Sequence, residues 1–288
     1  MSGTGQPGNG RSGKGPPASG GGRWGDLAPR IGSAIVMLAL GAGALWLGGL
    51  VFALTIAALA GLMVWELVRM LDPEGAFGAA AATGFSALVA VFVFQTNLPG
   101  VAAMVALGLA VPALGWPLPR PRLRGMAYLA LILFAAFALI TMREVYGLLW
   151  VLWLVLLVIG SDVAGYFAGR LIGGPKFWPA ISPKKTWSGT VAGWAVAAGI
   201  GAAFMAPLQA GAGLIALSVA VALAGQMGDI AESALKRRAG VKDSSNLIPG
   251  HGGVLDRFDA MIAAAVAFLL ADVTGIMGGL IRDGGLAG

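Results

Sequence analysis

A dense block of charged and polar residues lies between positions 225 and 259 of a chain that is otherwise 58% hydrophobic. Carboxylates bind Mg²⁺ through oxygen, and Lys and Arg neutralise phosphate oxygens, so a mixture of both suits a metal-bound polyphosphate. The block therefore predicts a catalytic surface. Its members are Asp229, Glu232, Asp243, Asp256, Lys236, Arg237, Arg238, Lys242, Arg257 and the single histidine of the chain, His251.

The first part of this block has helical spacing. Asp229, Glu232, Ser233 and Lys236 stand at i, i+3, i+4 and i+7. On a helix they form one polar stripe that leaves the membrane. A solvated helix face explains this stripe almost as well as a catalytic one, so the spacing leaves both interpretations open.

The second part is a flexible turn, Pro-Gly-His-Gly-Gly, at residues 249–253. It leads directly to Asp256 and Asp259, which stand one helical turn apart where the last apolar stretch begins. Two carboxylates at the mouth of a membrane helix are costly unless a cation or Arg257 offsets them. An N-cap is the alternative role for Asp256.

A second polar segment, 161–190, precedes another apolar stretch. Asp162, Tyr166 and Gly169 share one helix face, and Gly165 beside them permits close approach of another backbone. Adjacent ammonium groups follow, in the run Ser182-Pro183-Lys184-Lys185-Thr186. Such a loop can hold phosphate at a membrane surface, although lysines at this place also serve as ordinary positive-inside anchors.

Composition determines the class of protein in which these residues lie. Mean hydropathy is +0.84 and only 11% of residues are charged, against about a quarter in soluble domains. The chain is expected to be a polytopic membrane protein in the lipid bilayer. It has no cysteine, which excludes disulfides and thiolate metal sites. The net charge of +6 indicates loop bias and affinity for anionic headgroups, and no nucleic-acid partner is expected.

Apolar stretches long enough to cross a bilayer recur along the chain. They predict an all-α fold, a helical bundle with about nine transmembrane helices and its N-terminus inside. Arginines at positions 120, 122 and 124 then lie on the same side as both polar segments, so all the chemistry faces the cytoplasm. The expected spans are 31–48, 50–70, 76–95, 98–116, 125–142, 145–161, 189–207, 210–228 and 258–280.

Three regions follow from this organisation. Residues 1–30 are expected to form a disordered cytoplasmic tail, because their Gly, Ser and Pro cannot bury enough apolar surface to fold. Residues 31–142 supply N-terminal transmembrane helices. Residues 143–288 form the catalytic region, with cytoplasmic loops at 162–188 and 229–257.

The polar positions of the C-terminal region also match a known pattern. Ser233-Ala-Leu-Lys236-Arg237, Lys242-Asp243, Pro249-Gly-His251-Gly252-Gly253 and Asp256-Arg257-Phe-Asp259 follow one another in order. This run resembles the signature of the phosphatidate cytidylyltransferases, also called CDP-diacylglycerol synthases. Both motifs of segment 161–190 resemble that family too. The resemblance covers the C-terminal half well and the N-terminal half mainly by hydropathy.

The resemblance implies that CTP and phosphatidic acid react to give CDP-diacylglycerol and pyrophosphate with the help of Mg²⁺, and it leaves open a second metal or a monovalent ion. It implies Asp229 and Asp256 as metal ligands, then Asp162 and Asp259. Lys236, Arg237, Lys242 and Arg257 would neutralise phosphates, with Asp243 beside them in the catalytic group. The implied substrate-binding residues are Ser182, Lys184, Lys185, Thr186, Tyr166, Arg170, His251, Gly252 and Gly253. His251 either binds phosphate or fixes the glycine turn.

Several positions lie outside this pattern. Ser188 stands where the family often has a longer side chain. Glu66 is expected to be an interfacial anchor. Asp272 is expected to reach the far interface or to pair inside the bundle, and Arg143 and Glu144 to pair with each other or lie at an interface.

A CTP-dependent polyprenol or lipid kinase is the nearest alternative function, and a membrane transporter is a weaker one because repeated halves are missing. The inner membrane of a bacterium is the expected location. A homodimer stays open, since small residues such as Gly189 and Gly193 permit close helix packing.

Overall fold

A computed structural model describes residues 27–116, 118–119 and 122–285. Most of the expected tail, residues 1–26, lies outside these ranges, and so does Arg120. Residues 27–30 were expected in that tail, but they form the first turn of a helix.

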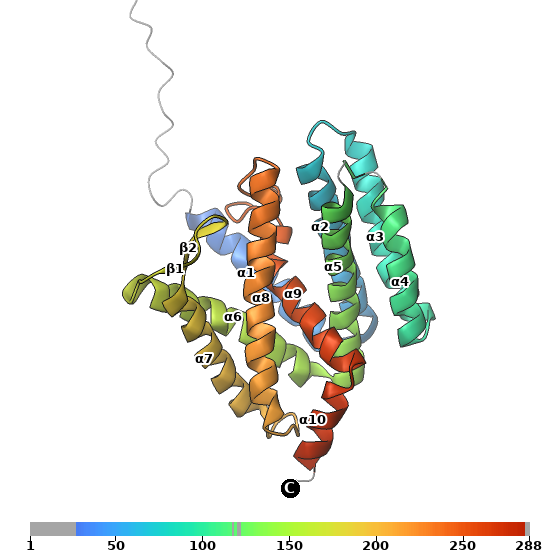
Figure 1. The fold of residues 1–288 in the computed structure, drawn as a ribbon. Helices are drawn as coiled ribbons and strands as arrows, with labels where there is room; N and C mark the ends of the chain where they lie inside the picture. Colours follow the sequence, from blue (N-terminus) through green and yellow to red (C-terminus); the bar gives the residue numbers. More distant parts are fainter. Residues whose placement is uncertain (1–26, 117, 120–121, 286–288) are drawn as a thin grey trace, which may run out of the picture.

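The described part of the chain is mostly helical, which confirms the all-α prediction (Figure 1). A short π-helical segment and one small hairpin of two antiparallel strands interrupt the helices. The elements are α1 (Leu27–Leu47), α2 (Gly49–Leu71), α3 (Phe77–Asn97), α4 (Gly100–Leu114), α5 (Arg122–Thr141), η1 (Met142–Tyr146), α6 (Leu148–Leu171), β1 (Lys176–Trp178), β2 (Ser182–Thr186), α7 (Trp187–Phe204), α8 (Gly213–Arg238), α9 (Leu255–Val273) and α10 (Ile276–Gly285).

A multi-pass membrane protein needs helices because lipid offers no hydrogen bonds to an open backbone. The helices pack around a core of large apolar side chains, among them Leu67, Ile132, Trp153 and Phe268, all almost completely buried. Other apolar side chains, such as Leu38, point outward. An outward apolar surface of this kind is expected where the neighbour is lipid.

The expected count of nine spans is not confirmed. Within the described ranges, six helices are long and apolar enough to cross a membrane, and the pair α9 and α10 makes a seventh if counted as one span. These two helices meet at an angle of 77°. The break follows from Gly275, whose φ of 81° takes the backbone out of the helical conformation. The part Ile31–Leu47 of α1 and helix α4 are apolar too, but each is shorter than the 18 residues of the shortest candidate span.

Both expected loops are partly helical. Residues 162–171 complete α6, and residues 229–238 complete α8. Between α6 and α7 lies the hairpin, in which Lys176 pairs with Thr186 and Trp178 pairs with Ser182. Thr186 then caps α7, because its hydroxyl accepts a hydrogen bond from the backbone N–H of Gly189 at 3.2 Å.

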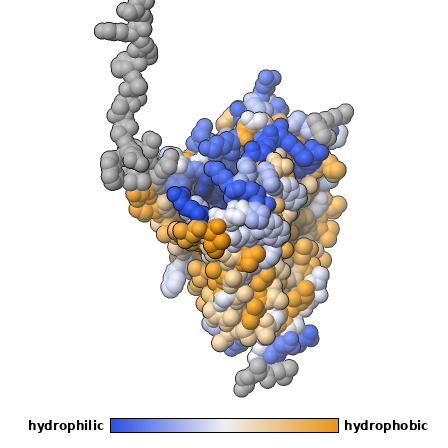
Figure 2. Space-filling model, turned by 60° about the vertical axis from the view of Figure 1, so that its left-hand side comes forward, coloured by the Kyte–Doolittle hydropathy of each residue, from blue (hydrophilic) through white to orange (hydrophobic). Residues whose placement is uncertain are grey.

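Polar residues gather at one end of the bundle. In Figure 2 the hydrophilic surface surrounds a hollow at this end, and the body below it is mostly apolar. The hairpin and the C-terminal end of α8 lie at this end, and α10 lies at the opposite end (Figure 1).

Charged residues of the opposite end find partners inside the bundle. Arg143, which was expected to pair with Glu144 or lie at an interface, donates from its Nε to the backbone carbonyl of Leu45 at 3.0 Å. Asp272 accepts a hydrogen bond from the hydroxyl of Tyr146, whose ring packs edge-on against Phe268. Asp272, expected at the far interface or paired inside the bundle, thus has a side-chain partner at this end of the bundle.

Candidate active site

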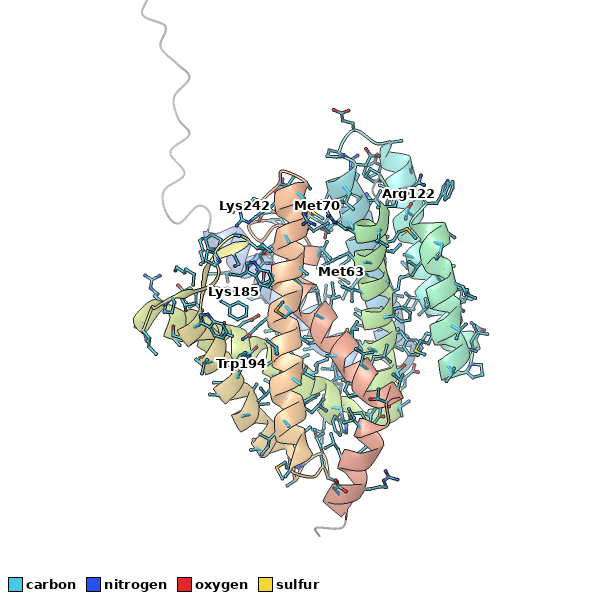
Figure 3. The ribbon with its side chains drawn as sticks, in the orientation of Figure 1. Met63, Met70, Arg122, Lys185, Trp194 and Lys242 are labelled. Atoms are coloured by element: carbon cyan, nitrogen blue, oxygen red, sulfur yellow. The ribbon has the colours of Figure 1, made fainter. Side chains whose placement is uncertain are left out.

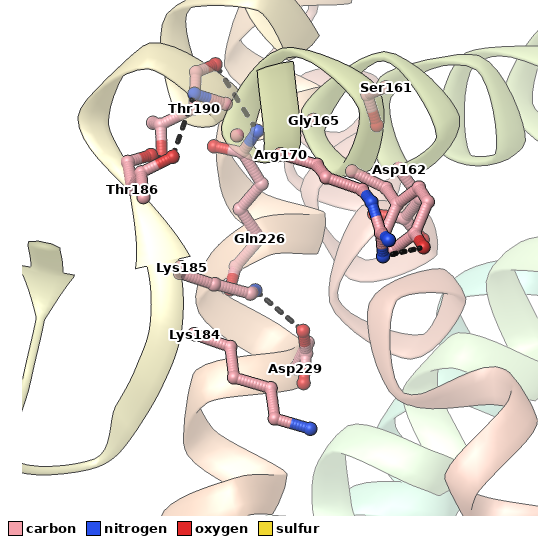
Figure 4. Close-up of a pocket in the computed structure, with 13 residues that line it drawn as sticks. Ser161, Asp162, Gly165, Arg170, Lys184, Lys185, Thr186, Thr190, Gln226 and Asp229 are labelled. Carbon is pink, nitrogen blue, oxygen red and sulfur yellow. Dashed lines mark hydrogen bonds and ion pairs between the residues drawn. The ribbon is translucent and has the colours of Figure 1, made fainter. Parts of the chain in front are cut away.

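A cavity of about 420 Å³ opens between α6, the hairpin, α7 and α8 (Figure 4). Helix α6 contributes one wall, strand β2 and the start of α7 a second, and the middle of α8 a third. The lining residues are Ser161, Asp162, Gly165, Tyr166, Gly169, Arg170, Lys184, Lys185, Thr186, Gly189, Thr190, Gln226 and Asp229.

An ion pair crosses this cavity. Nζ of Lys185 lies 2.5 Å from Oδ2 of Asp229, and the two side chains are 25% and 33% exposed (Figure 4). The same Nζ donates to the backbone carbonyl of Gln226 at 3.2 Å. Lys184 lies beside this pair and is exposed. An ammonium group that is partly open to solvent can exchange its carboxylate partner for a phosphate oxygen at little cost.

One carboxylate of the cavity lies within electrostatic range of carboxylates on two other helices. Asp229 on α8 interacts with Asp162 on α6 and with Asp259 on α9. Asp162 is exposed to the cavity, whereas Asp259 is half-buried and accepts from the N–H of Ala260 at 2.7 Å. Asp229 therefore interacts electrostatically with two of the other predicted ligands, Asp162 and Asp259.

Glycines let α6 and α7 approach closely at the cavity wall. A Cβ atom at Gly189 would lie 2.5 Å from the backbone oxygen of Gly165, which no side chain tolerates. The expected close approach of a backbone to Gly165 is thus confirmed. A Cβ atom at Gly169 would lie 2.8 Å from Oγ1 of Thr186. These glycines therefore allow the backbones of α6 and α7 to pack in direct contact at the cavity wall.

Polar side chains at the rim of the cavity form hydrogen bonds with one another and with backbone carbonyls. Nη1 of Arg170 donates to the hydroxyl of Tyr166 at 3.2 Å, and both residues are exposed. Ser188 donates to the backbone carbonyl of Gly173 at 2.5 Å, so this short side chain fixes the base of the hairpin. Nε of Arg237 donates to the carbonyl of Ile181 at 2.5 Å, which joins the tip of the hairpin to α8.

Gln226 is a cavity residue that sequence reasoning missed. Its side chain is buried, and its Oε1 accepts from the indole N–H of Trp194 at 3.1 Å. Figure 3 shows Trp194 on α7 below Lys185. The position stands one turn before Asp229, and this spacing was the available signal that it shares the same face.

Beside the cavity, α8 presents a second group of charges toward α9. Nζ of Lys236 lies 2.6 Å from Oε2 of Glu232 and 2.7 Å from Oδ1 of Asp256. The exposed fractions are 14% for Lys236, 0% for Glu232 and 3% for Asp256. The alternative interpretation of this stripe as a solvent-exposed helix face is therefore wrong for Glu232, which is buried. A single ammonium group separates two buried carboxylates.

Asp256 is almost saturated with donors. Its Oδ2 accepts from the backbone N–H of Ser244 at 2.9 Å, from the hydroxyl of Ser244 at 2.9 Å and from the N–H of Gly253 at 2.8 Å. Its Oδ1 accepts from Lys236. In this arrangement the carboxylate organises the loop that precedes α9.

The predicted glycine turn fits the same arrangement. Gly252 has a φ of 85° and pairs with Ile248 across a small bridge. A Cβ atom at Gly253 would lie 2.0 Å from Oγ of Ser244. Nδ1 of His251 lies 2.9 Å from Oγ of Ser33 on α1. These contacts fit the interpretation in which His251 fixes the turn.

Lys242, Asp243 and Arg257 are exposed at the polar end of the molecule. Figure 3 places Lys242 above Lys185 at this end. The C-terminal motif thus has two parts: these three residues are exposed, whereas Lys236 and Asp256 are largely buried.

Glu66 was expected to be an interfacial anchor, and that expectation is wrong. Its side chain on α2 is fully buried beneath the loop before α9, where it accepts hydrogen bonds from that loop. A carboxylate inside an otherwise apolar stretch was the signal that it has buried partners.

The fold and the site together define a multi-pass membrane protein with an open, charged cavity at one end of its helical bundle. A family model described as "Cytidylyltransferase family" matches residues 28–273. The chain therefore belongs to the cytidylyltransferase family, and it is a nucleotidyltransferase.

Relatives from several bacteria carry the name phosphatidate cytidylyltransferase. One from Brucella suis is 34% identical over 265 residues, which is 85% of this chain and 93% of that protein. One from Pseudomonas aeruginosa is 34% identical over 269 residues, covering 84% of this chain and 95% of that protein. One from Bacillus subtilis is 39% identical over 131 residues, or 44% of this chain and 49% of that protein.

Proposed function

We propose that this enzyme transfers CMP from CTP to phosphatidic acid and releases pyrophosphate. The observation that carries the proposal is the partly exposed pair of Lys185 and Asp229 in a cavity between membrane helices. A lipid phosphate and a soluble nucleotide can meet only where an apolar surface borders a charged one. The names of the relatives agree with this pair of substrates.

The chemistry follows from the charges of the substrates. An oxygen of the lipid phosphate attacks the α-phosphorus of CTP, and the bond from that phosphorus to the oxygen bridging to the β-phosphate breaks. The nucleophile is already anionic, so no strong general base is needed. Lys184, Lys185 and Arg170 neutralise phosphate oxygens and hold the two substrates in line. Lys185 leaves Asp229 for a phosphate when the substrates enter.

The carboxylates of the cavity suit Mg²⁺. Among the described residues, no three His, Cys, Asp or Glu side chains converge closely enough to hold a metal alone. Mg²⁺ commonly binds through one or two carboxylates together with substrate phosphates and water, and it offsets charge on the attacking and leaving oxygens when bound. Asp229 is best placed to hold it, with Asp162 or Asp259. These carboxylates repel one another, and a cation relieves that repulsion.

The buried part of the C-terminal motif supports this cavity. Asp256, a predicted metal ligand, already accepts hydrogen bonds from four donors, and in this proposal it supports the cavity. Arg237 anchors the hairpin that carries Lys184 and Lys185. Lys242 and Arg257 are exposed at the entrance, where they attract the triphosphate before it reaches the cavity.

The polar end faces the cytoplasm in this proposal, since CTP is a cytoplasmic nucleotide, and the enzyme lies in the inner membrane of a bacterium. The acyl chains of the lipid stay in the bilayer beside α6, whose surface near the cavity carries the exposed apolar residues Val163 and Phe167. Self-association as a homodimer stays a prediction.

The purified enzyme in detergent with phosphatidic acid, Mg²⁺ and CTP labelled separately at the α and γ positions tests the proposal. The α label is expected in lipid and the γ label in pyrophosphate. Asp229→Asn is expected to reduce the rates of α-label transfer and of γ-label release about 100- to 1,000-fold, on the scale of one lost preorganised charge. Arg282→Gln, an exposed change on α10, is the control and keeps full activity. Transfer of the γ label to a lipid would instead identify a kinase.

A further inference from the structure

Glu66 is the one fully buried carboxylate of the described N-terminal helices, and the chemistry proposed above does not use it. It lies on α2, in the half of the chain that carries no recognisable motif. Its partners lie 178 to 189 residues further along the chain. A buried ionised group is retained only where donors surround it, so these partners indicate what the carboxylate does.

Four donors surround the Glu66 carboxylate. Oε1 accepts from the hydroxyl of Ser245 at 2.5 Å and from the backbone N–H of Val254 at 2.9 Å. Oε2 accepts from the N–H of Leu255 at 2.6 Å and from the hydroxyl of Ser244 at 3.3 Å. The two N–H groups belong to the start of α9, where the helix dipole also favours a negative charge.

The contacts continue from Glu66 toward the site. Ser244, which touches Glu66, also holds Oδ2 of Asp256 through its N–H and its hydroxyl. Asp256 in turn accepts from Lys236. The backbone at Gly253 passes so close that a Cβ atom there would lie 2.7 Å from Oε1 of Glu66. The carboxylate thus fixes the loop, the first turn of α9 and, through Ser244, the orientation of Asp256.

We propose that Glu66 is a positioning residue for the reaction, supplied by the N-terminal half of the chain. It holds segment 244–256 so that Asp256 and Asp259 project from α9 at a fixed angle toward Lys236 and Asp229. This proposal rests on the proposed function for its kinetic consequence. Its structural consequence, the ordering of segment 244–256, is independent of that function.

Glu66→Gln is the sharpest variant, because it keeps the shape and replaces one acceptor oxygen with a donor. At least one of the two N–H groups of α9 then loses its acceptor. The expected result is a 10- to 100-fold lower kcat with unchanged KM for CTP and phosphatidic acid, the scale seen when a supporting hydrogen-bond partner is lost. Glu66→Asp keeps the charge and recovers part of the kcat.

Glu74→Gln is the matched control, since Glu74 lies exposed in the turn after α2. It should leave kcat unchanged. Ser244→Ala should also lower kcat, and the double variant with Glu66→Gln should lose less than the product of the two single losses, because both act through one network. If the fold-loss in kcat of the double variant equalled the product of the two single losses, the proposed connection between Glu66 and Ser244 would be contradicted.

Hydrogen exchange of backbone amides supplies a readout that needs no activity. Glu66→Gln is expected to speed exchange in segment 244–260 and to leave α3 and α4 unchanged. Unchanged exchange in that segment, or a normal kcat in a protein that merely melts at lower temperature, would overturn the proposal. If the wild-type enzyme moved no α label at all, the proposed function would fail, and the exchange result would still decide whether Glu66 holds the segment.

Discussion

The charged side chains on the two faces of α8 differ in their exposure to solvent. Toward the cavity, Lys185 and Asp229 form an ion pair whose side chains are 25% and 33% exposed. Toward α9, Lys236 joins Glu232 and Asp256, whose side chains are 0% and 3% exposed. Partners that are open to water can be exchanged for a substrate, whereas buried partners cannot separate without unfolding their surroundings. In the proposed function the open face is therefore the reacting side, and the buried face supports it.

Lys236→Met tests the buried face and carries the largest expected effect. The substitution leaves Glu232 and Asp256 buried without their shared cation, which should destabilise the fold by about 3–5 kcal/mol and abolish activity. Thermal unfolding in detergent measures the first and the label assay the second. Arg282→Gln, at an exposed position on α10, should change neither. A stable Lys236→Met protein would remove the distinction between the two faces.

Lys185→Met tests the open face. Activity should fall about 100-fold because a cation that neutralises phosphate is lost. The unfolding midpoint should stay close to that of the wild type, since a partly exposed pair contributes about 0–1 kcal/mol. Lys176→Met on the same hairpin is the control, because Lys176 is exposed and does not line the cavity. A large loss of stability would mean that the open pair is structural as well.

Gly189→Ala sharpens the comparison at the wall of the cavity. The added methyl group would lie 2.5 Å from the backbone oxygen of Gly165, so α6 and α7 must separate, at about 1–3 kcal/mol. The unfolding midpoint should fall and KM for the lipid should rise as the wall shifts. Gly199→Ala on the same helix meets nothing within 4 Å and should leave both values unchanged. Equal behaviour of the two variants would contradict the close packing.

Tyr146→Phe carries the smallest expected effect. It removes the hydrogen bond to Asp272 at the end of the bundle opposite the cavity. Stability should fall by about 1 kcal/mol, because a partly buried carboxylate loses its donor. Activity per folded molecule should not change, as measured by the label assay on protein freshly purified at low temperature. A loss of kcat here would show that the two ends of the bundle are coupled.

The helix spacing of the C-terminal region predicted much of the site. Asp162, Tyr166 and Gly169 share one face of α6, and all three line the cavity with Asp229. Such predictions succeed because they depend on residues within a few turns of one helix, where geometry follows directly from spacing.

Features that depend on distant contacts could not be predicted in this way. Hydropathy measures how apolar a stretch is, so it could not show that α9 turns away from α10 at Gly275. It also could not show that the segment around Lys184 forms a strand, since that depends on pairing with β1. Glu66 was misinterpreted because all four of its donors lie beyond residue 243.

The distance between Glu66 and its donors has a consequence for biosynthesis. A ribosome adds about 5–20 residues per second, so the 178 residues between Glu66 and Ser244 take on the order of 10–40 s. During that interval α2 must enter the bilayer with a carboxylate that has not yet met its donors. The inserted state of α2 is then expected to be weakly stable until α9 is synthesised and its N–H groups bind the Glu66 carboxylate.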